Sequence, residues 1–221
     1  MGSSATSMLD VSSLIGDANW NDPGPQANHV VSNFTVPFPS ISAPYTVGLT
    51  PSSRTIGGVD YRYVLTGSSS NLPPIDYLVS ALTSQFIVTS NSNVRLVVNG
   101  SVLLPALRDI GNCVIEPGAR LQLYVLGSHF DLRQYGIENR TKSPTSFIYW
   151  GGNSNTQISI GDGCPFHGYI VAPQASINFL ANPTSTGVLD VSGTILGKTI
   201  NASGTVAFHA DRAFFLLGSG R

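Results

Sequence analysis

One short pattern returns along the second half of this 221-residue chain. Two to four apolar residues are followed by glycine or another small turn residue, as in Arg95–Gly100 and Gln122–Gly127. The same pattern ends again at residues 151, 173 and 198, so its successive steps are 27, 24, 22 and 25 residues. A repeat at a period of roughly 20–50 residues is the sequence signature of solenoids and related arrays. This repeat therefore constrains the fold more than any other feature of the chain.

Two further series of short apolar segments accompany the main one. One lies between the main strands, at residues 157–160, 176–179 and 199–202, and the other precedes them, at 113–115 and 188–191. Glycine, proline and asparagine separate the segments and supply the backbone angles that tight bends require. A single coil of three such strands cannot bury its apolar face alone, whereas stacked coils bury a continuous core. The pattern predicts an all-β chain, a parallel β-solenoid with coils of about 22–27 residues.

An immunoglobulin-like sandwich is the main alternative, because short strands with turn signals also suit that fold. The repeat step is about twice the spacing of roughly 8–12 residues that sandwich strands show. The same type of strand also returns at each step, where a sandwich would show paired hairpins. Both features favour the solenoid.

Charge and hydropathy exclude several classes of partner. Eleven basic and twelve acidic residues give a net charge of −1, so we expect no binding to nucleic acid. The longest apolar segments, such as residues 213–217, hold five to seven residues. That is far short of the roughly 20 residues that cross a bilayer as a helix, so we expect no membrane-spanning segment.

The first 60 residues differ from the rest. They are rich in serine and proline, and such prolines prevent a regular interior strand. We expect residues 1–60 to form an extended arm and residues 61–217 to form the solenoid, with a C-terminal cap near residues 207–217. Residues 75–88 fit either a first coil or a short helix, and the second half of this segment favours a strand.

The order of four motifs resembles an uncharacterised bacterial β-helix domain of PilX-type pilin-like and other cell-surface proteins. The motifs are Gly118–Gly127, Gly168–Ala175, Gly193–Lys198 and Ser203–Asp211, and the resemblance covers roughly residues 85–215. It implies a right-handed β-helix, an exported location and no established enzymatic activity. The chain departs from this pattern at Val171, where the family often has tyrosine. It also departs at residues 128–146, which we interpret as an insertion, and it lacks the N-terminal helix of pilins.

Aligning the main strands predicts two adjacent columns of side chains. One column holds Leu96, Leu123, Ile148, Ile170 and Ile195, and its β-branched and leucine side chains suit the core. The other holds Val97, Tyr124, Tyr149, Val171 and Leu196 and is expected to face outward, with Trp150 beside it. An exposed apolar and aromatic stripe marks a contact surface. We interpret Tyr124, Tyr149, Trp150, Val171 and Leu196 either as a platform for sugars or a partner, or as a surface that the N-terminal arm covers.

Polar and thiol groups yield no catalytic or metal-binding pattern. The acidic residues do not stack at one coil length, so we interpret them as solvated corner residues and expect no catalytic residue, cofactor or metal. His209 and Asp211 are two apart on a strand, and a polar capping role suits them. Cys113 and Cys164 lie 51 residues apart, about two coils. Two coils separate Cα atoms by nearly 10 Å, beyond disulfide reach unless residues 128–146 change the count.

These observations predict a non-catalytic, extracellular subunit of a cell surface or pilus-like appendage. Its expected partners are other copies of itself or other appendage subunits, through the arm or the solenoid ends, and surface glycans. The alternatives are a polysaccharide-binding module and a polysaccharide lyase or hydrolase on the same scaffold.

Overall fold

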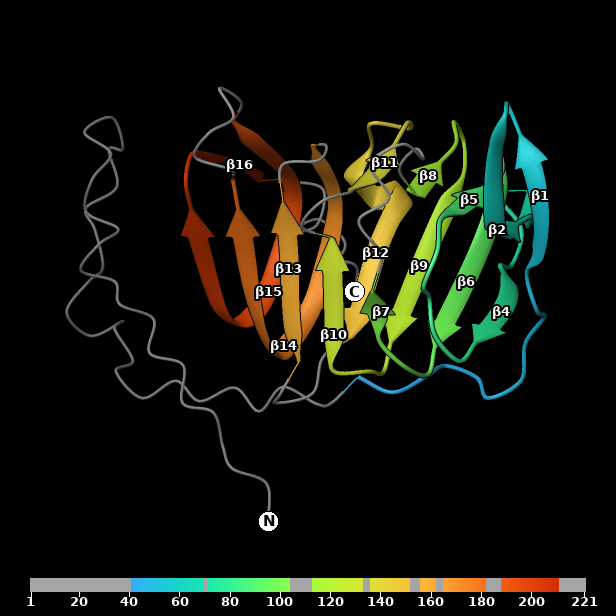
Figure 1. Cartoon of the computed structure of the whole chain (residues 1–221), viewed down its shortest axis with the longest axis horizontal. Helices are drawn as coiled ribbons and strands as arrows, with labels where there is room; N and C mark the ends of the chain where they lie inside the picture. The colour runs from blue at the N-terminus through green and yellow to red at the C-terminus, as the bar shows by residue number, and fades with distance from the viewer. Residues whose placement is uncertain are drawn as a thin grey trace, which may run out of the picture. The chain divides into compact units, whose positions relative to one another are not determined.

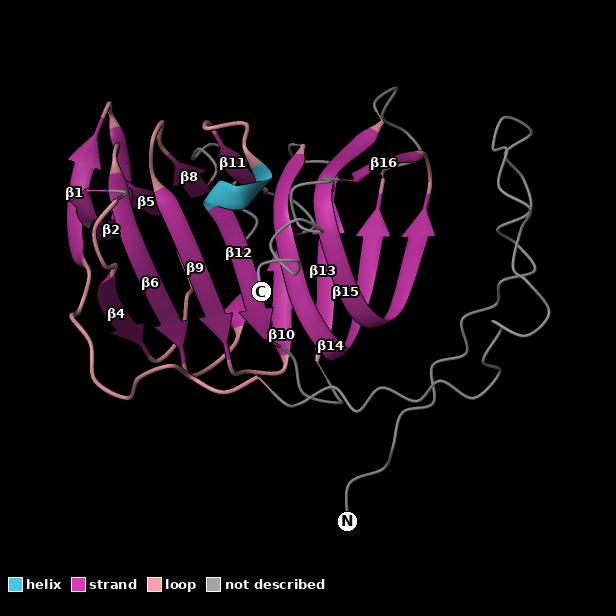
Figure 2. Ribbon diagram, turned by 180° about the vertical axis from the view of Figure 1, so that it is seen from behind, coloured by secondary structure: helices cyan, strands magenta, loops and turns pink. Residues whose placement is uncertain are grey.

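The computed structural model describes residues 41–69, 71–103, 113–132, 136–151, 156–161, 165–181 and 188–210. Within these ranges the chain forms a β-solenoid of about five turns with almost no helix (Figure 1). The predicted fold class is therefore confirmed. In the described ranges the 3₁₀ turn Pro144–Ser146 is seen as the cyan ribbon in Figure 2.

Successive coils place their strands on three faces. The first face contains β2 (Val59–Leu65), β5 (Phe86–Val88), β8 (Cys113–Ile115) and β11 (Ile137–Asn139). The second contains β4 (Ile75–Val79), β6 (Ser92–Val98), β9 (Arg120–Val125) and β12 (Phe147–Gly151). The third contains β7 (Val102–Leu103), β10 (His129–Leu132) and β13 (Gln157–Gly161). These strands pair in parallel with their neighbours on the same face.

The last coils contain longer strands. β14 (Phe166–Leu180) and β15 (Leu189–Ser203) each pass from the second face to the third, with a register shift between Ala172 and Ser176 at the corner. β16 (Val206–Ala210) pairs in parallel with the start of β15. Residues 206–210 thus add one more strand to the stack. The rest of the predicted cap, residues 211–217, lies outside the described residues.

The N-terminal end of the stack is built differently. β1 (Ser52–Ile56) forms an antiparallel hairpin with β2 through Gly57 and Gly58, whose φ angles are +60° and +81°. Such positive φ angles suit the tight turns of β-hairpins. The short strand β3 (Ser68–Ser69) also pairs antiparallel, with β6. The boundary predicted at residue 60 falls inside β2, and residues 1–40 of the predicted arm lie outside the described residues.

The described residues 128–132 and 136–146 belong to the coil, so the loop-like insertion predicted at 128–146 is wrong. They contribute β10 to the third face and β11 to the first face. The short strands of this segment carry charged and polar residues on their outward positions, which hid the apolar pattern. Segment 75–88, predicted as a first coil or a short helix, contains β4 and β5.

The core follows the axis of the solenoid without interruption. Its central column is formed by inward side chains at matching register positions, which are Tyr77, Leu96, Leu123, Tyr149, Ile170 and Ile195. Four of them, from Leu96 to Ile170, are fully buried. Because every coil adds side chains to the same column, the core lengthens with each repeat and each coil depends on its two neighbours.

Candidate functional site

The predicted aromatic stripe lies on the outer side of the second face. Register pairing places Val97, Tyr124, Trp150, Val171 and Leu196 in one outward column. Val97 is buried and the other four are partly exposed. Four of the five predicted stripe residues, Tyr124, Trp150, Val171 and Leu196, therefore lie together.

Tyr149 does not belong to the stripe, and its predicted outward position is wrong. It pairs with Leu123 and Ile170, and its side chain is 0% exposed. The sequence alignment set Tyr149 beside Tyr124, whereas the structure sets Trp150 there. Because side chains alternate along a strand, this slip of one residue exchanged the core and the surface of β12. Ile148, predicted in the core column, is correspondingly partly exposed and pairs with Gln122 and Tyr169.

Two rings form the centre of the stripe. The Tyr124 and Trp150 rings are stacked with centroids 5.9 Å apart and planes 10° apart. Parallel strands hold them side by side, and the Tyr124 hydroxyl lies 3.3 Å from Oε1 of Gln122 on the same strand. Burial raises the pKa of Tyr124 above its ordinary value, so its hydroxyl stays neutral at physiological pH. The result is an uncharged, stacked aromatic pair with a polar group beside it.

An ion pair borders the stripe, and sequence reasoning missed it. Arg95 Nε and Nη2 bind the two carboxylate oxygens of Asp76 at 2.7 and 2.8 Å, a bidentate arrangement. The side-chain hydrogen bond to Asp76 raises the pKa of Arg95 further. The two residues hold matching register positions on β4 and β6, but the first half of segment 75–88 was not predicted as a strand, so their pairing could not be read from the sequence.

Tyr45 packs against this ion pair. The Arg95 guanidinium carbon lies 5.3 Å from the centre of the Tyr45 ring. The Tyr45 hydroxyl lies 2.7 Å from the carbonyl oxygen of Tyr77 and 3.0 Å from that of Arg95. Desolvation by burial raises the pKa of Tyr45 well above its ordinary value. Tyr45, a residue of the predicted arm, thus contacts the N-terminal end of the second face.

Other charged groups pair at the surface of the described solenoid. Arg140 binds Glu116 at 2.7 Å and Glu138 at 3.0 Å. His209 Nε2 lies 2.8 Å from Oδ1 of Asp190, one strand away. The predicted partner of His209, Asp211, lies outside the described residues. No three His, Cys, Asp or Glu side chains gather as metal ligands in the described ranges.

Only one of the two cysteines lies among the described residues. Cys113 is buried in the core on β8, where it pairs with Ile137 of β11. Cys164 lies outside the described residues, so the separation of the two thiols expected from their spacing stays a prediction.

Large exposed apolar side chains occur only at the two ends of the described solenoid, and sequence reasoning missed them. Val47, Leu49 and Leu72 belong to the N-terminal end, and Val188, Ile200 and Phe208 belong to the C-terminal end. Leu49 forms a bridge to Tyr77 of β4, and Leu72 lies in the turn between β3 and β4. Among the described residues of the coils between the ends, no large apolar side chain belongs to this exposed class.

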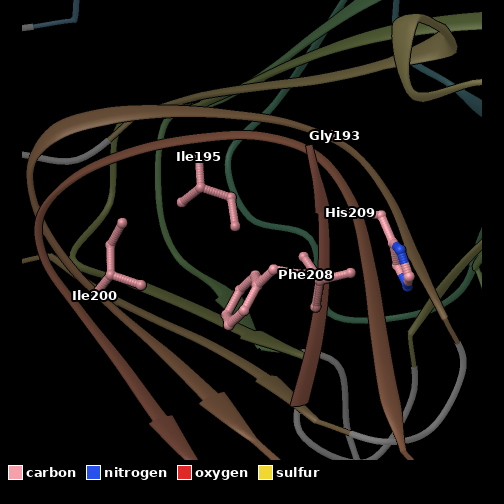
Figure 3. Close-up of a pocket in the computed structure, with 6 residues that line it drawn as sticks. Gly193, Ile195, Ile200, Phe208 and His209 are labelled. Carbon is pink, nitrogen blue, oxygen red and sulfur yellow. The ribbon is translucent and has the colours of Figure 1, made fainter. Parts of the chain in front are cut away.

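The C-terminal end contains a hollow of about 360 Å³ (Figure 3). It is lined by residues of β15 and β16, namely Val191, Gly193, Ile195, Ile200, Phe208 and His209. Ile195 continues the central core column, and the Phe208 ring packs edge-on against Phe179 at 5.2 Å. The hollow is therefore the open end of the core itself.

Comparison with protein families adds one finding. Residues 76–215 match the model of a domain of unknown function, DUF7305. The chain belongs to this family. DUF7305 carries no assigned function, so the resemblance to PilX-type pilin-like proteins stays a prediction. No curated protein and no solved structure matches the chain.

In the part of the chain that the structure describes, no helix is long and apolar enough to span a bilayer.

Proposed function

We propose that this DUF7305 chain is a non-catalytic structural subunit of a cell surface or pilus-like appendage, and that copies associate head to tail through their solenoid ends. The single observation that carries this proposal is the position of the exposed apolar side chains. All six large ones in the described residues lie on the terminal coils. Exposed apolar patches favour contact with a partner.

Head-to-tail contact follows from the difference between the two ends. The N-terminal end presents Val47 and Leu49 beside β4, whereas the C-terminal end presents a hollow beside β15 and β16. Unlike patches on one chain form a heterologous contact, which extends into a filament when the rotation does not close. A rigid solenoid suits this role because its core is continuous along the axis of stacking.

Two single variants test the proposal. Val47 is 84% exposed and Val188 is 53% exposed, so Val47→Asp and Val188→Asp leave the core intact. We expect the wild-type chain to associate with rising concentration in size-exclusion chromatography with light scattering. Each variant alone loses that association, because a heterologous contact needs both ends. Ser159→Asp, on the third face away from both ends, is the control and associates as the wild type does.

Mixing the two variants gives the decisive measurement. Each variant retains one intact end, so an equimolar mixture forms a dimer that does not grow further. If Val47→Asp still dimerises alone, the contact joins two C-terminal ends and the head-to-tail arrangement is wrong. A wild-type chain that stays monomeric at all concentrations, with single particles in electron micrographs, overturns the proposal of self-association.

A second function, polysaccharide binding, is favoured by the Tyr124 and Trp150 stack. The two rings are stacked on the outer side of the second face with 10° between their planes, and exposed aromatic side chains suit the apolar faces of sugar rings. A glycan array with wild-type protein and Trp150→Ala tests it. Loss of a glycan signal in Trp150→Ala supports binding, and the absence of any signal for the wild type excludes it for the glycans on the array. Tyr149→Ala is unsuitable as a probe because Tyr149 is buried in the core.

A further inference from the structure

The segment that precedes β1 is fastened to the N-terminal end of the solenoid at two points, and it is the blue loop that leads into β1 in Figure 1. At the first point, Leu49 forms a parallel bridge with Tyr77 of β4. The Leu49 N–H donates to the carbonyl oxygen of Asp76 at 2.8 Å, and the Leu78 N–H donates to that of Leu49 at 3.0 Å. Leu49 therefore extends the second face by one paired residue beyond β4.

Tyr45 is the second point of attachment. Its hydroxyl lies 2.7 Å from the carbonyl oxygen of Tyr77 on β4 and 3.0 Å from that of Arg95 on β6. The centre of its ring lies 5.3 Å from the guanidinium carbon of Arg95, a cation–π contact, and Asp76 holds that guanidinium by two hydrogen bonds. One side chain thus joins the segment to two successive strands of the solenoid.

Val47 lies midway between the two points and is 84% exposed, the highest value among the large apolar side chains of the described residues. The neighbouring Gly48 runs so close to β4 that a Cβ atom there would come within 3.1 Å of the backbone of Asp76, Tyr77 and Leu78. The backbone around Val47 is therefore held while its side chain stays exposed. Fixing a loop in its bound conformation beforehand lowers the entropy that is lost on association.

We propose that Tyr45 is a positioning residue, which latches residues 45–49 onto β4 and β6 and so holds Val47 in place for the contact with a second copy. The contact rests on the proposed function, whereas the latch does not. Desolvation by burial raises the pKa of Tyr45 well above its ordinary value, so its hydroxyl keeps its proton at physiological pH and can donate. Asp76 acts through Tyr45, because it fixes the Arg95 guanidinium against the Tyr45 ring.

The latch predicts that the N-terminal contact can be weakened without changing the residues that make it. Tyr45→Ala removes the ring and the hydroxyl but leaves Val47 and Leu49 unchanged. Tyr45→Phe keeps the ring beside Arg95 and loses only the hydroxyl, so its effect should be intermediate. Thr46→Ala is the matched control, because Thr46 is an exposed neighbour of Tyr45 in the same segment.

Hydrogen exchange measured by mass spectrometry on the full chain tests the latch. In Tyr45→Ala we expect peptides that contain Leu78 to exchange at least about tenfold faster than in the wild type or Thr46→Ala, because the Leu78 N–H loses its acceptor on Leu49. Peptides from β12 report on the fold and exchange equally in all the proteins. Equal exchange at Leu78 in all of them overturns the inference. If Tyr45→Ala also loses protection in β12, Tyr45→Phe decides, and unchanged exchange at Leu78 in that variant overturns the inference.

Light scattering on the same proteins separates the latch from the proposed function. If Tyr45→Ala associates only at concentrations at least about tenfold higher than the wild type needs, Tyr45 positions the contact. If Leu78 exchanges faster in Tyr45→Ala but no protein associates, the latch stands and the proposed self-association is wrong. If Tyr45→Ala associates as readily as an associating wild type, Tyr45 does not position the contact and the inference is wrong.

Discussion

Removal of one buried hydroxyl is expected to stabilise the protein. The hydroxyl of Tyr149 is buried in the core and makes no hydrogen bond within the described structure. Its ring packs against Phe130 with centroids 4.4 Å apart, and this packing is kept in Tyr149→Phe. An unsatisfied buried polar group costs about 1–3 kcal/mol. We therefore expect Tyr149→Phe to raise the free energy of unfolding by about 1 kcal/mol, which corresponds to a rise in Tm of roughly 2–4 °C for a domain of this size.

Tyr77 provides a matched control in the same core column. Its hydroxyl donates to the carbonyl oxygen of Thr66 at 2.9 Å and accepts from the Thr66 N–H at 3.2 Å. Tyr77→Phe removes the same atom but leaves both backbone groups without this partner. We expect it to lower the free energy of unfolding by about 1–2 kcal/mol. Urea denaturation followed by circular dichroism measures both variants. If Tyr149→Phe destabilises the protein as much as Tyr77→Phe does, a hydrogen-bond partner for Tyr149 exists and the reasoning fails.

The same residue affects stability at high pH. Burial raises the pKa of Tyr149 above its ordinary value of about 10, so the folded state holds this proton where the unfolded state releases it. The folded state then binds more protons, and stability falls as the pH rises above about 10. Tyr149→Phe removes this contribution, so the gain in stability over the wild type grows above pH 10. A gain that shrinks with rising pH contradicts the burial of a neutral hydroxyl.

Two further predictions concern the backbone and the surface. Gly193 has a φ of +138°, and a Cβ atom there would overlap the carbonyl oxygen of Gly168, so Gly193→Ala should lower the free energy of unfolding by about 3 kcal/mol in urea denaturation. Gly58 has a φ of +81° with open space around it, and Gly58→Ala should cost only about 1 kcal/mol; equal losses at the two positions would contradict the close approach at Gly193. Arg140→Met should cost less than about 1 kcal/mol, because the ion pairs of Arg140 with Glu116 and Glu138 are largely exposed. The loss should shrink in 1 M salt when unfolding is repeated there, and a loss that persists would point to packing of the side chain.

The repeat step made the fold predictable because the same chemistry returns in each coil. Leu96, Leu123, Ile170 and Ile195 were placed in one column from the sequence, and register pairing places them together. The prediction of strands failed where the outward residues of the coil are polar. β10 and β11 carry polar outward residues and were interpreted as an insertion. The tertiary stack fixes these strands although their local pattern is weak.

The slip at β12 has a different physical origin. Tyr149 and Trp150 are both large and aromatic, so composition alone does not tell which one faces inward. The alternation within the strand does, because Phe147 and Tyr149 share one side and are both buried, while Ile148 and Trp150 are partly exposed. Hydrophobicity does not tell which side of a strand is buried when both sides are apolar, as they are in β12 on the second face of this solenoid.

Two physical explanations account for the exposed apolar side chains at the ends of the solenoid. They predict different dependences of stability on protein concentration. Each inner coil is covered on both sides, whereas a terminal coil is covered on one, so any solenoid exposes apolar side chains at an uncapped end. If a second copy covers that end, stability rises with protein concentration as mass action requires. If the end stays open in solution, the Tm is the same at every concentration. The concentration dependence of Tm therefore distinguishes a contact between chains from an open end, without any knowledge of the ligand or the appendage.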